Sequence, residues 1–116
     1  MIVPGKQRSK SNHYRRGRGR GFFIPKEITA YEEMIRNLAA KEMKRTKQNV
    51  FYNPVKMVVV FYLPDKRRRD LDNLFKTVSD ALNKIVYHDD SQIRELHLYR
   101  DYDIINPRTE ILVEMY

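Results

Sequence analysis

The hydrophobic residues of this chain recur in alternating helical and strand-like patterns. Between about residues 26 and 47 they return at every third or fourth position, which predicts an amphipathic helix. Residues 55 to 63, VKMVVVFYL, form a nearly continuous run of β-branched and aromatic residues. Such a run is typical of a central strand that is buried on both faces, and Pro64 ends it.

A second helical pattern begins at Leu71 and ends near Ile85. Its apolar positions step by three and four residues and fall within one stripe of a helical wheel. The opposite face carries the polar residues Asp72, Lys76, Ser79, Asp80 and Asn83. The sequence then turns through YHDDS at residues 87 to 91.

Two further strands are predicted at about residues 92 to 99 and 110 to 116. The segment DYDIINPRT between them favours a loose hairpin, and the short run FFI at residues 22 to 24 is another candidate strand. A length of 116 residues fits a single compact domain over residues 1 to 116. We therefore predict an α+β fold, a mostly antiparallel mixed sheet of about four strands with two helices against it.

Composition restricts the class of protein. Hydrophobic residues make up 41% of the chain and charged residues 33%, as in a folded soluble protein. The absence of cysteine excludes disulfides and thiolate metal sites and suits a cytoplasmic protein. No apolar run approaches the roughly 18 residues of a membrane span, and the start, MIVPGKQRSK, lacks the apolar stretch of a secretory signal. The expected location is the cytoplasm, without membrane contact.

The net charge of +8 is concentrated near the start of the chain. Residues 1 to 21 hold seven of the 23 cations and none of the 15 acids. Within them RRGRGRG alternates arginine with glycine, which predicts a flexible basic arm able to follow a phosphate backbone. Such clustering favours a polyanionic partner, with nucleic acid before an acidic membrane, over the simple alternative of a solubilising tail. The candidate DNA-binding residues of the arm are Arg15, Arg16, Arg18 and Arg20.

A second cationic cluster runs directly into two aspartates at the start of the second helix. Residues 65 to 76 read DKRRRDLDNLFK. Asp70 falls at the helix cap and Asp72 in the first turn, so one interpretation is structural: a cap, a favourable dipole contact, and an ordinary pair between Asp72 and Lys76. Alternatively, a cap residue outside the helix can turn its carboxylate toward that of Asp72. Two carboxylates then begin a site for a hard cation such as Mg²⁺.

A third carboxylate would complete such a site, and Asp89 and Asp90 are the candidates. They lie in the polar turn after the second helix, where an Asx turn is the simple structural alternative. They can meet Asp70 only if the strand after residue 90 begins beside the end of the strand at residues 55 to 63. We therefore expect these two strands to be antiparallel neighbours.

The surrounding cations suit a phosphodiester substrate. A metal held by three carboxylates would activate water or stabilise the leaving oxygen. Lys76, one turn beyond Asp72, would offset the negative charge that grows around phosphorus during hydrolysis. The residues that would bind neighbouring phosphates are Lys66, Arg67, Arg68 and Arg69. The pattern indicates a nuclease in which a metal brings carboxylates and a polyanion together.

Residues 63 to 100, LPDKRRRDLDNLFKTVSDALNKIVYHDDSQIRELHLYR, resemble the RusA family of Holliday-junction resolvases. The resemblance is carried by the core D-x-D-N-x-x-K, a short helix and D-D-x-Q-I. It extends to SNHYRRGRGRGF and PKEITAYEEMI, which are similar to the family's N-terminal loop and first helix. The apolar first strand expected of the family has only MIVP to match it here.

The resemblance implies a metal-dependent crossover junction endodeoxyribonuclease that acts on branched DNA. By this likeness the catalytic residues are Asp70, Asp72, Asp90 and Lys76, the three acids binding Mg²⁺ or, in its place, Mn²⁺. Arg69 would belong to the substrate-binding cluster, and only the likeness favours Asp90 over Asp89. A homodimer is also implied, and the approximate two-fold symmetry of a four-way junction agrees with a pair of equal sites. Recognition would rest on shape and phosphate contacts.

Two other functions fit parts of the pattern. A non-catalytic nucleic-acid-binding module would use the basic arm and the arginine cluster, with the aspartates serving as caps and turns. A nuclease-like regulator would keep the fold with catalysis lost. Acids beside a cationic surface weaken phosphate binding, so the intact acidic set favours the enzyme.

Overall fold

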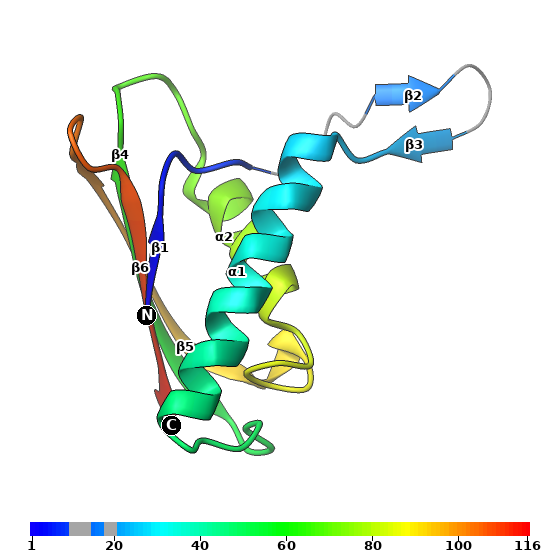
Figure 1. The fold of residues 1–116 in the computed structure, drawn as a ribbon, viewed down its shortest axis with the longest axis vertical. Coiled ribbons are helices and arrows are strands. Elements are labelled where there is room, and N and C mark those ends of the chain that lie inside the picture. The colour runs from blue at the N-terminus through cyan, green and yellow to red at the C-terminus, as the bar shows by residue number, and fades with distance from the viewer. Residues whose placement is uncertain (10–14, 18–20) are drawn as a thin grey trace.

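A four-stranded sheet with two helices on one of its faces makes up the body of the molecule (Figure 1). The computed structural model describes residues 1–9, 15–17 and 21–116. The order of the strands is β1 (Ile2–Pro4), β6 (Arg108–Met115), β4 (Val55–Leu63) and β5 (Ile93–Tyr102). The helices are α1 (Lys26–Arg45) and α2 (Leu71–Leu82). The predicted α+β class with a mostly antiparallel mixed sheet is confirmed.

A separate two-stranded unit projects beyond the start of α1 (Figure 1). It consists of β2 (Arg15–Gly17) and β3 (Gly21–Phe23), which pair in the antiparallel sense. The strand predicted at residues 22 to 24 therefore forms, but it lies outside the four-stranded sheet. The fourth strand of that sheet is β1 instead.

The strand β5 has neither the direction nor the hairpin partner that the sequence suggested. It runs parallel to β4, while β6 pairs with the other edge of β4 in the antiparallel sense. β4 thus separates β5 from β6, and the predicted hairpin is wrong. The reason lies in the connection through α2, whose twelve residues carry the chain back along the sheet. β5 consequently starts with Ile93 beside Val55, at the beginning of β4.

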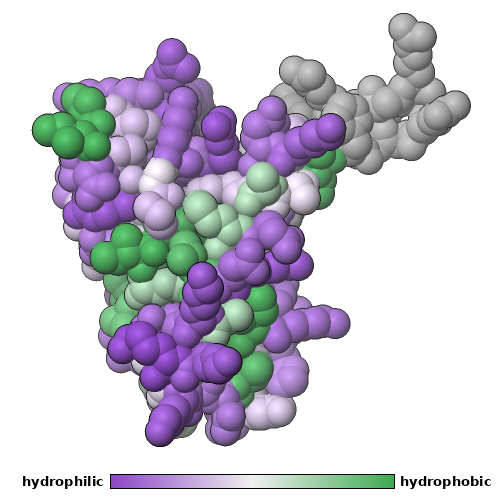
Figure 2. Space-filling view, viewed as in Figure 1, coloured by the Kyte–Doolittle hydropathy of each residue, from purple (hydrophilic) through white to green (hydrophobic). Residues whose placement is uncertain are grey.

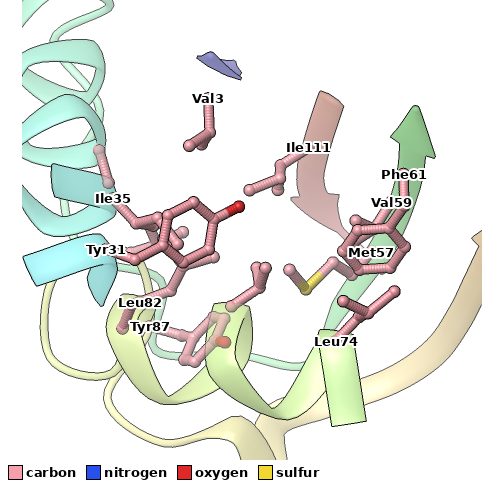
Figure 3. Close-up of a cluster of buried hydrophobic side chains, with 14 of the residues drawn as sticks. Val3, Tyr31, Ile35, Met57, Val59, Phe61, Leu74, Leu82, Tyr87 and Ile111 are labelled. Atoms are coloured by element: carbon pink, nitrogen blue, oxygen red, sulfur yellow. The ribbon is translucent and has the colours of Figure 1, made fainter. Parts of the chain in front are cut away.

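The hydrophobic core lies between the helices and one face of β4. Alternate residues of β4 are buried on that face, namely Val55, Met57, Val59, Phe61 and Leu63. Figure 3 shows Met57, Val59 and Phe61 gathered with side chains from both helices. Val58 and Val60 point to the opposite face and are only half-buried. The prediction that β4 is buried on both faces is wrong, because both helices cover the same face.

α2 has the predicted apolar stripe, and it packs against α1 and the sheet. Leu74, Val78 and Leu82 have at most 2% of their surface exposed. Ser79, expected on the polar face, is buried: its hydroxyl donates to the carbonyl of Lys76 at 3.2 Å, and its own carbonyl accepts from the Tyr87 hydroxyl at 3.0 Å. Within the described part of the chain, no helix has the length and apolarity needed to cross a membrane.

The first residues of the chain belong to the body rather than to a flexible arm. β1 pairs with the start of β6, and Val3 has no exposed surface. Gln7 is 4% exposed, and its side-chain amide donates to the carbonyls of Tyr62 at 2.9 Å and Arg108 at 2.7 Å. MIVP therefore supplies the first strand. The candidate residues Arg18 and Arg20 lie outside the described residues, and for Arg15 and Arg16 the description extends only to the backbone of β2.

Candidate active site

Asp70 lies at the junction between the loop after β4 and the first turn of α2. Its backbone is extended (φ −84°, ψ 129°), and its carbonyl oxygen accepts a helical hydrogen bond from the amide of Leu74 at 3.1 Å. The carboxylate makes no capping hydrogen bond, and 52% of the side chain is exposed. The backbone of Asp70 begins the helix without help from the side chain, so the carboxylate is available to a ligand.

Asp72 and Lys76 follow on the exposed face of α2. The simple alternative, an ion pair between them, is not formed in the part of the chain that the structure describes. Both side chains therefore extend into solvent from successive turns of one helix face. The ammonium of Lys76 also acts on Asp90, where it lowers the pKa of the carboxyl against the larger effect of burial.

Of the four cations at residues 66 to 69 that are predicted to bind DNA, three have exposed side chains. Lys66, Arg67 and Arg68 are exposed in the loop that leads from β4 to α2. The side chain of Arg68 is 92% exposed, and its Nε lies 3.7 Å from Oδ1 of Asp70. This loop places exposed positive charge directly beside the carboxylate at the start of α2.

Arg69 differs from its neighbours because its side chain is held inside the loop. Only 12% of this side chain is exposed, and Nη1 donates to Oδ1 of Asp65 at 2.7 Å. The carbonyl of Arg69 in turn accepts a hydrogen bond from the guanidinium of Arg100 in β5. Arg69 thus fixes the shape of the loop and ties it to the sheet, immediately before Asp70.

The pair between Asp65 and Arg69 predicts a specific pH dependence of stability. The hydrogen bond from Arg69, followed by that from the amide of Arg67, lowers the pKa of Asp65 from 3.8 to about 2. The carboxyl of Asp65 is more acidic in the folded chain than in the unfolded chain. The pair therefore stabilises the fold fully above the unfolded pKa of Asp65, and this contribution is lost as the pH falls from about 4 to about 2. We expect Asp65→Asn to lower the thermal unfolding midpoint at pH 7, and this difference to shrink toward pH 2, as followed by circular dichroism. A difference that stays constant over this range would contradict the role of the charge.

The side chains of Asp89 and Asp90 have different environments in the turn before β5. The carboxylate of Asp89 accepts a hydrogen bond from the amide of Ser91 at 2.9 Å and caps the short 3₁₀ helix Asp90–Gln92. The side-chain oxygen of Gln92 accepts from the amides of His88 at 2.8 Å and Asp89 at 3.0 Å. Asp89 therefore fills the structural role predicted as the alternative for this pair.

The carboxylate of Asp90 takes no part in this cap and is partly buried. Burial raises its pKa, and the carboxylates of Asp89 and Asp80 raise it further, while the ammonium of Lys76 lowers it. Asp90 thus sits in a concentration of negative charge that a cation would relieve. Asp90 as the third ligand stays a prediction, and its carboxylate lies outside the cap that Asp89 forms.

The three predicted metal ligands do not converge within one chain. Among the described residues, which include all of these acids, no group of three acidic or histidine side chains is close enough to hold a metal ion. Because β5 is parallel to β4, Asp90 lies beyond the far end of α2 from Asp70. α2 has twelve residues, so about 18 Å of helix separates its two ends. The expected antiparallel pairing that would have joined Asp70 and Asp90 is wrong.

Three residues outside the predicted site set, Asp65, Gln92 and Arg100, hold the segments around the site in place. Gln92 donates from its amide nitrogen to the carbonyls of Phe51 at 2.8 Å and Asn53 at 3.1 Å, which fastens the turn before β5 to the segment preceding β4. The motif D-D-x-Q gave a signal for this residue. Asp65 and Arg100 had none, because their partners are known only once the loop is folded.

The comparisons with known proteins agree on one family. The family model described as "Endodeoxyribonuclease RusA" matches residues 3–114. The chain is similar to the crossover junction endodeoxyribonuclease RusA of Escherichia coli (strain K12), with 36% identity over 87 residues, which cover 73% of this chain and 68% of that protein. The proteins of the same name from Enterobacteria phage 82 and Shigella sonnei (strain Ss046) are each 37% identical, with the same coverage.

Proposed function

The chain belongs to the RusA family of endodeoxyribonucleases, and we propose that it resolves four-way DNA junctions by metal-dependent cleavage of phosphodiester bonds. The observation that carries this proposal is that acidic side chains which cap no helix lie close to exposed cations. Asp70 makes no capping bond, and Asp90 stays out of the cap that Asp89 forms. A purely DNA-binding surface gains nothing from such acids, whereas a metal site requires them.

We propose that Asp70 and Asp72, together with a carboxylate of Asp90, hold Mg²⁺, for which Mn²⁺ can substitute. Mg²⁺ prefers oxygen ligands and commonly uses one or two carboxylates, with water and phosphate oxygens completing its shell. The carboxylates of Asp70 and Asp72 are exposed and two residues apart at the start of α2, which fits this requirement. When bound, the ion supplies Lewis-acid stabilisation of the leaving oxygen and a more acidic water.

A homodimer would supply the third carboxylate. Since Asp70 and Asp90 lie beyond opposite ends of α2, a two-fold arrangement with antiparallel α2 helices would place Asp90 of the partner subunit beside Asp70 and Asp72. The same operation would create a second, equal site. A four-way junction must be cut on two opposed strands, and a symmetric pair of sites meets this need.

The cations of the chain would bind and orient the substrate. Exposed Arg67 and Arg68, with Lys66, would hold phosphates on either side of the scissile bond. Lys76 would lie close to the developing charge around phosphorus and stabilise it. Arg69, predicted to contact DNA, is held inside the loop, so we assign it the positioning of the loop that presents Asp70.

Cleavage of a synthetic junction tests this proposal. The purified protein is incubated with a labelled mobile four-way junction, with Mg²⁺ or with a chelator, and the products are sized on a denaturing gel. We expect paired nicks in opposed strands with Mg²⁺ and none with the chelator. Tight junction binding without cleavage in any divalent ion would instead support a non-catalytic binding module.

The basic arm should contribute affinity rather than catalysis. Each arginine that contacts a duplex phosphate changes the slope of log K against log salt by about 0.9. Replacing Arg15, Arg16, Arg18 and Arg20 with glutamine should therefore reduce the salt slope of junction binding by about three to four, with little change in the rate of cleavage at saturation. Gel-shift titrations at several salt concentrations measure the slope. An unchanged slope would show that the arm does not contact phosphates.

A further inference from the structure

An apolar loop tip projects from the end of the sheet where β4 and β5 end. Ile104 and Ile105, here called the apolar tip, are 79% and 96% exposed in the loop between β5 and β6. Figure 2 shows an isolated hydrophobic patch among hydrophilic residues at the corner where Figure 1 draws this loop. Single exposed apolar residues are common, but two adjacent isoleucines at the end of a protrusion form a distinct feature.

The loop that carries the apolar tip is held in shape by hydrogen bonds at its base. The carboxylate of Asp103 accepts from the amide of Asn106 at 3.0 Å and from the guanidinium of Arg108 at 2.8 Å. The amide of Asp103 donates to the carbonyl of Leu63 at 2.8 Å, and that of Gly5 donates to the carbonyl of Pro107 at 2.9 Å. The two isoleucines between these anchors are therefore presented to solvent by a braced turn, and neither packs back onto the core.

The apolar tip stands beside the loop that carries Asp70 and the exposed cations. Tyr102, at the end of β5, pairs with Leu63 at the end of β4, where the cationic loop begins. Nζ of Lys66 lies 5.7 Å from the centre of the Tyr102 ring, and Arg100 donates to the carbonyl of Arg69. Figure 1 shows both loops at the same end of the molecule. A polyanion bound by the cations is thus brought to the apolar tip.

We propose that the apolar tip inserts between base pairs at the branch point of the junction. This inference rests on the proposed function and adds a means of selecting branched DNA over duplex DNA. Proteins that insert isoleucine or similar side chains into a base step must first unstack it. Strands exchange partners at a branch point, so a base step there opens at less cost than one within a continuous duplex. The nearby positive charge favours DNA as the occupant over a second copy of this basic chain.

Two measurements test the proposal together: base unstacking at the branch point, and the preference of the protein for junction over duplex DNA. The double variant Ile104→Ser/Ile105→Ser is compared with the wild type and with Leu112→Ser, which removes another exposed apolar side chain, one on β6. Binding is measured with Ca²⁺ in place of Mg²⁺, to a four-way junction with 2-aminopurine at the branch point and to a duplex of matched sequence. We expect the double variant to lose the 2-aminopurine fluorescence increase. We also expect its preference for junction over duplex to fall about tenfold, the equivalent of about 1.4 kcal/mol.

The other outcomes would overturn the proposal. Fluorescence and preference equal to those of the wild type would show that the apolar tip does not enter the DNA, and an equal loss of affinity for both DNAs would reduce it to a general contact. A double variant that changes its sedimentation behaviour while keeping its preference would assign the tip to contact between copies. The proposed function is tested separately by junction cleavage with the wild-type protein. If the wild type cuts junctions and the variant keeps full selectivity, only the role of the tip is refuted. Ile105→Ser alone provides the same readouts if the double variant does not fold.

Discussion

Asp70→Asn is expected to abolish junction cleavage while leaving junction affinity unchanged or higher. The substitution keeps the shape of the side chain and the backbone bond that begins α2, because the carboxylate takes no part in the cap. It would remove one of the proposed metal ligands and one negative charge from the proposed site. We expect cleavage to fall by more than about 100-fold, since even residues that only support a metal ligand cost about 10- to 100-fold when changed. Cleavage at saturating enzyme and gel-shift titration measure the two effects.

Asp101→Asn is a matched control for this substitution. Asp101 is an exposed acid near the end of β5, and its carboxylate accepts a hydrogen bond only from the neighbouring amide of Tyr102 among the described residues. Its replacement makes the same change of charge near the same end of the sheet and should leave cleavage intact. Weaker binding by Asp70→Asn with undiminished cleavage would contradict the assignment of Asp70 to the metal.

The second large effect should distinguish the two adjacent acids before β5. We expect Asp90→Asn to lower cleavage by more than about 100-fold, for the reason given for Asp70. Asp89→Asn should change it by less than about threefold, because asparagine caps a helix about as well as aspartate and can still accept the bond from Ser91. Cleavage rates for the two variants under identical conditions make the comparison. The reverse order of effects would move the metal site to Asp89 and leave Asp90 without a role.

Local sequence patterns predicted the elements that carry the site, because each depends on neighbouring residues. The apolar spacing after Leu71 gave α2, and the run VKMVVVFYL gave β4. The place of Asp70 at the junction of loop and helix followed from these two elements. Family likeness added the choice of Asp90 over Asp89.

The relations between elements were harder to predict, because they depend on partners far apart in the chain. A strand, a helix and a second strand in succession are the pattern of a parallel crossover, and the direction of β5 could have been inferred from it. Val58 and Val60 stay half-exposed because both helices cover the other face of the sheet. No local sequence pattern tells whether helices cover one face or both. Arg69 looked like its neighbours in sequence, yet only the folded loop brings it to Asp65.

We propose that two chains together complete each metal site. Asp70→Asn and Asp90→Asn are each expected to be inactive alone. When their subunits are exchanged, mixed dimers would contain one site with Asp70 and Asp72 from one chain and Asp90 of the partner subunit, all intact. The mixture should therefore recover junction nicking, whereas a mixture of Asp70→Asn with Asp72→Asn should not, because both of its sites remain damaged.

The most direct measurement is thus the nicking of a labelled four-way junction by the exchanged Asp70→Asn and Asp90→Asn proteins in Mg²⁺. Recovery of single-strand nicks, absent from either variant alone, is the predicted result. A mixture that stays as inactive as its components, although both variants exchange subunits with the wild type, would contradict a site shared between chains.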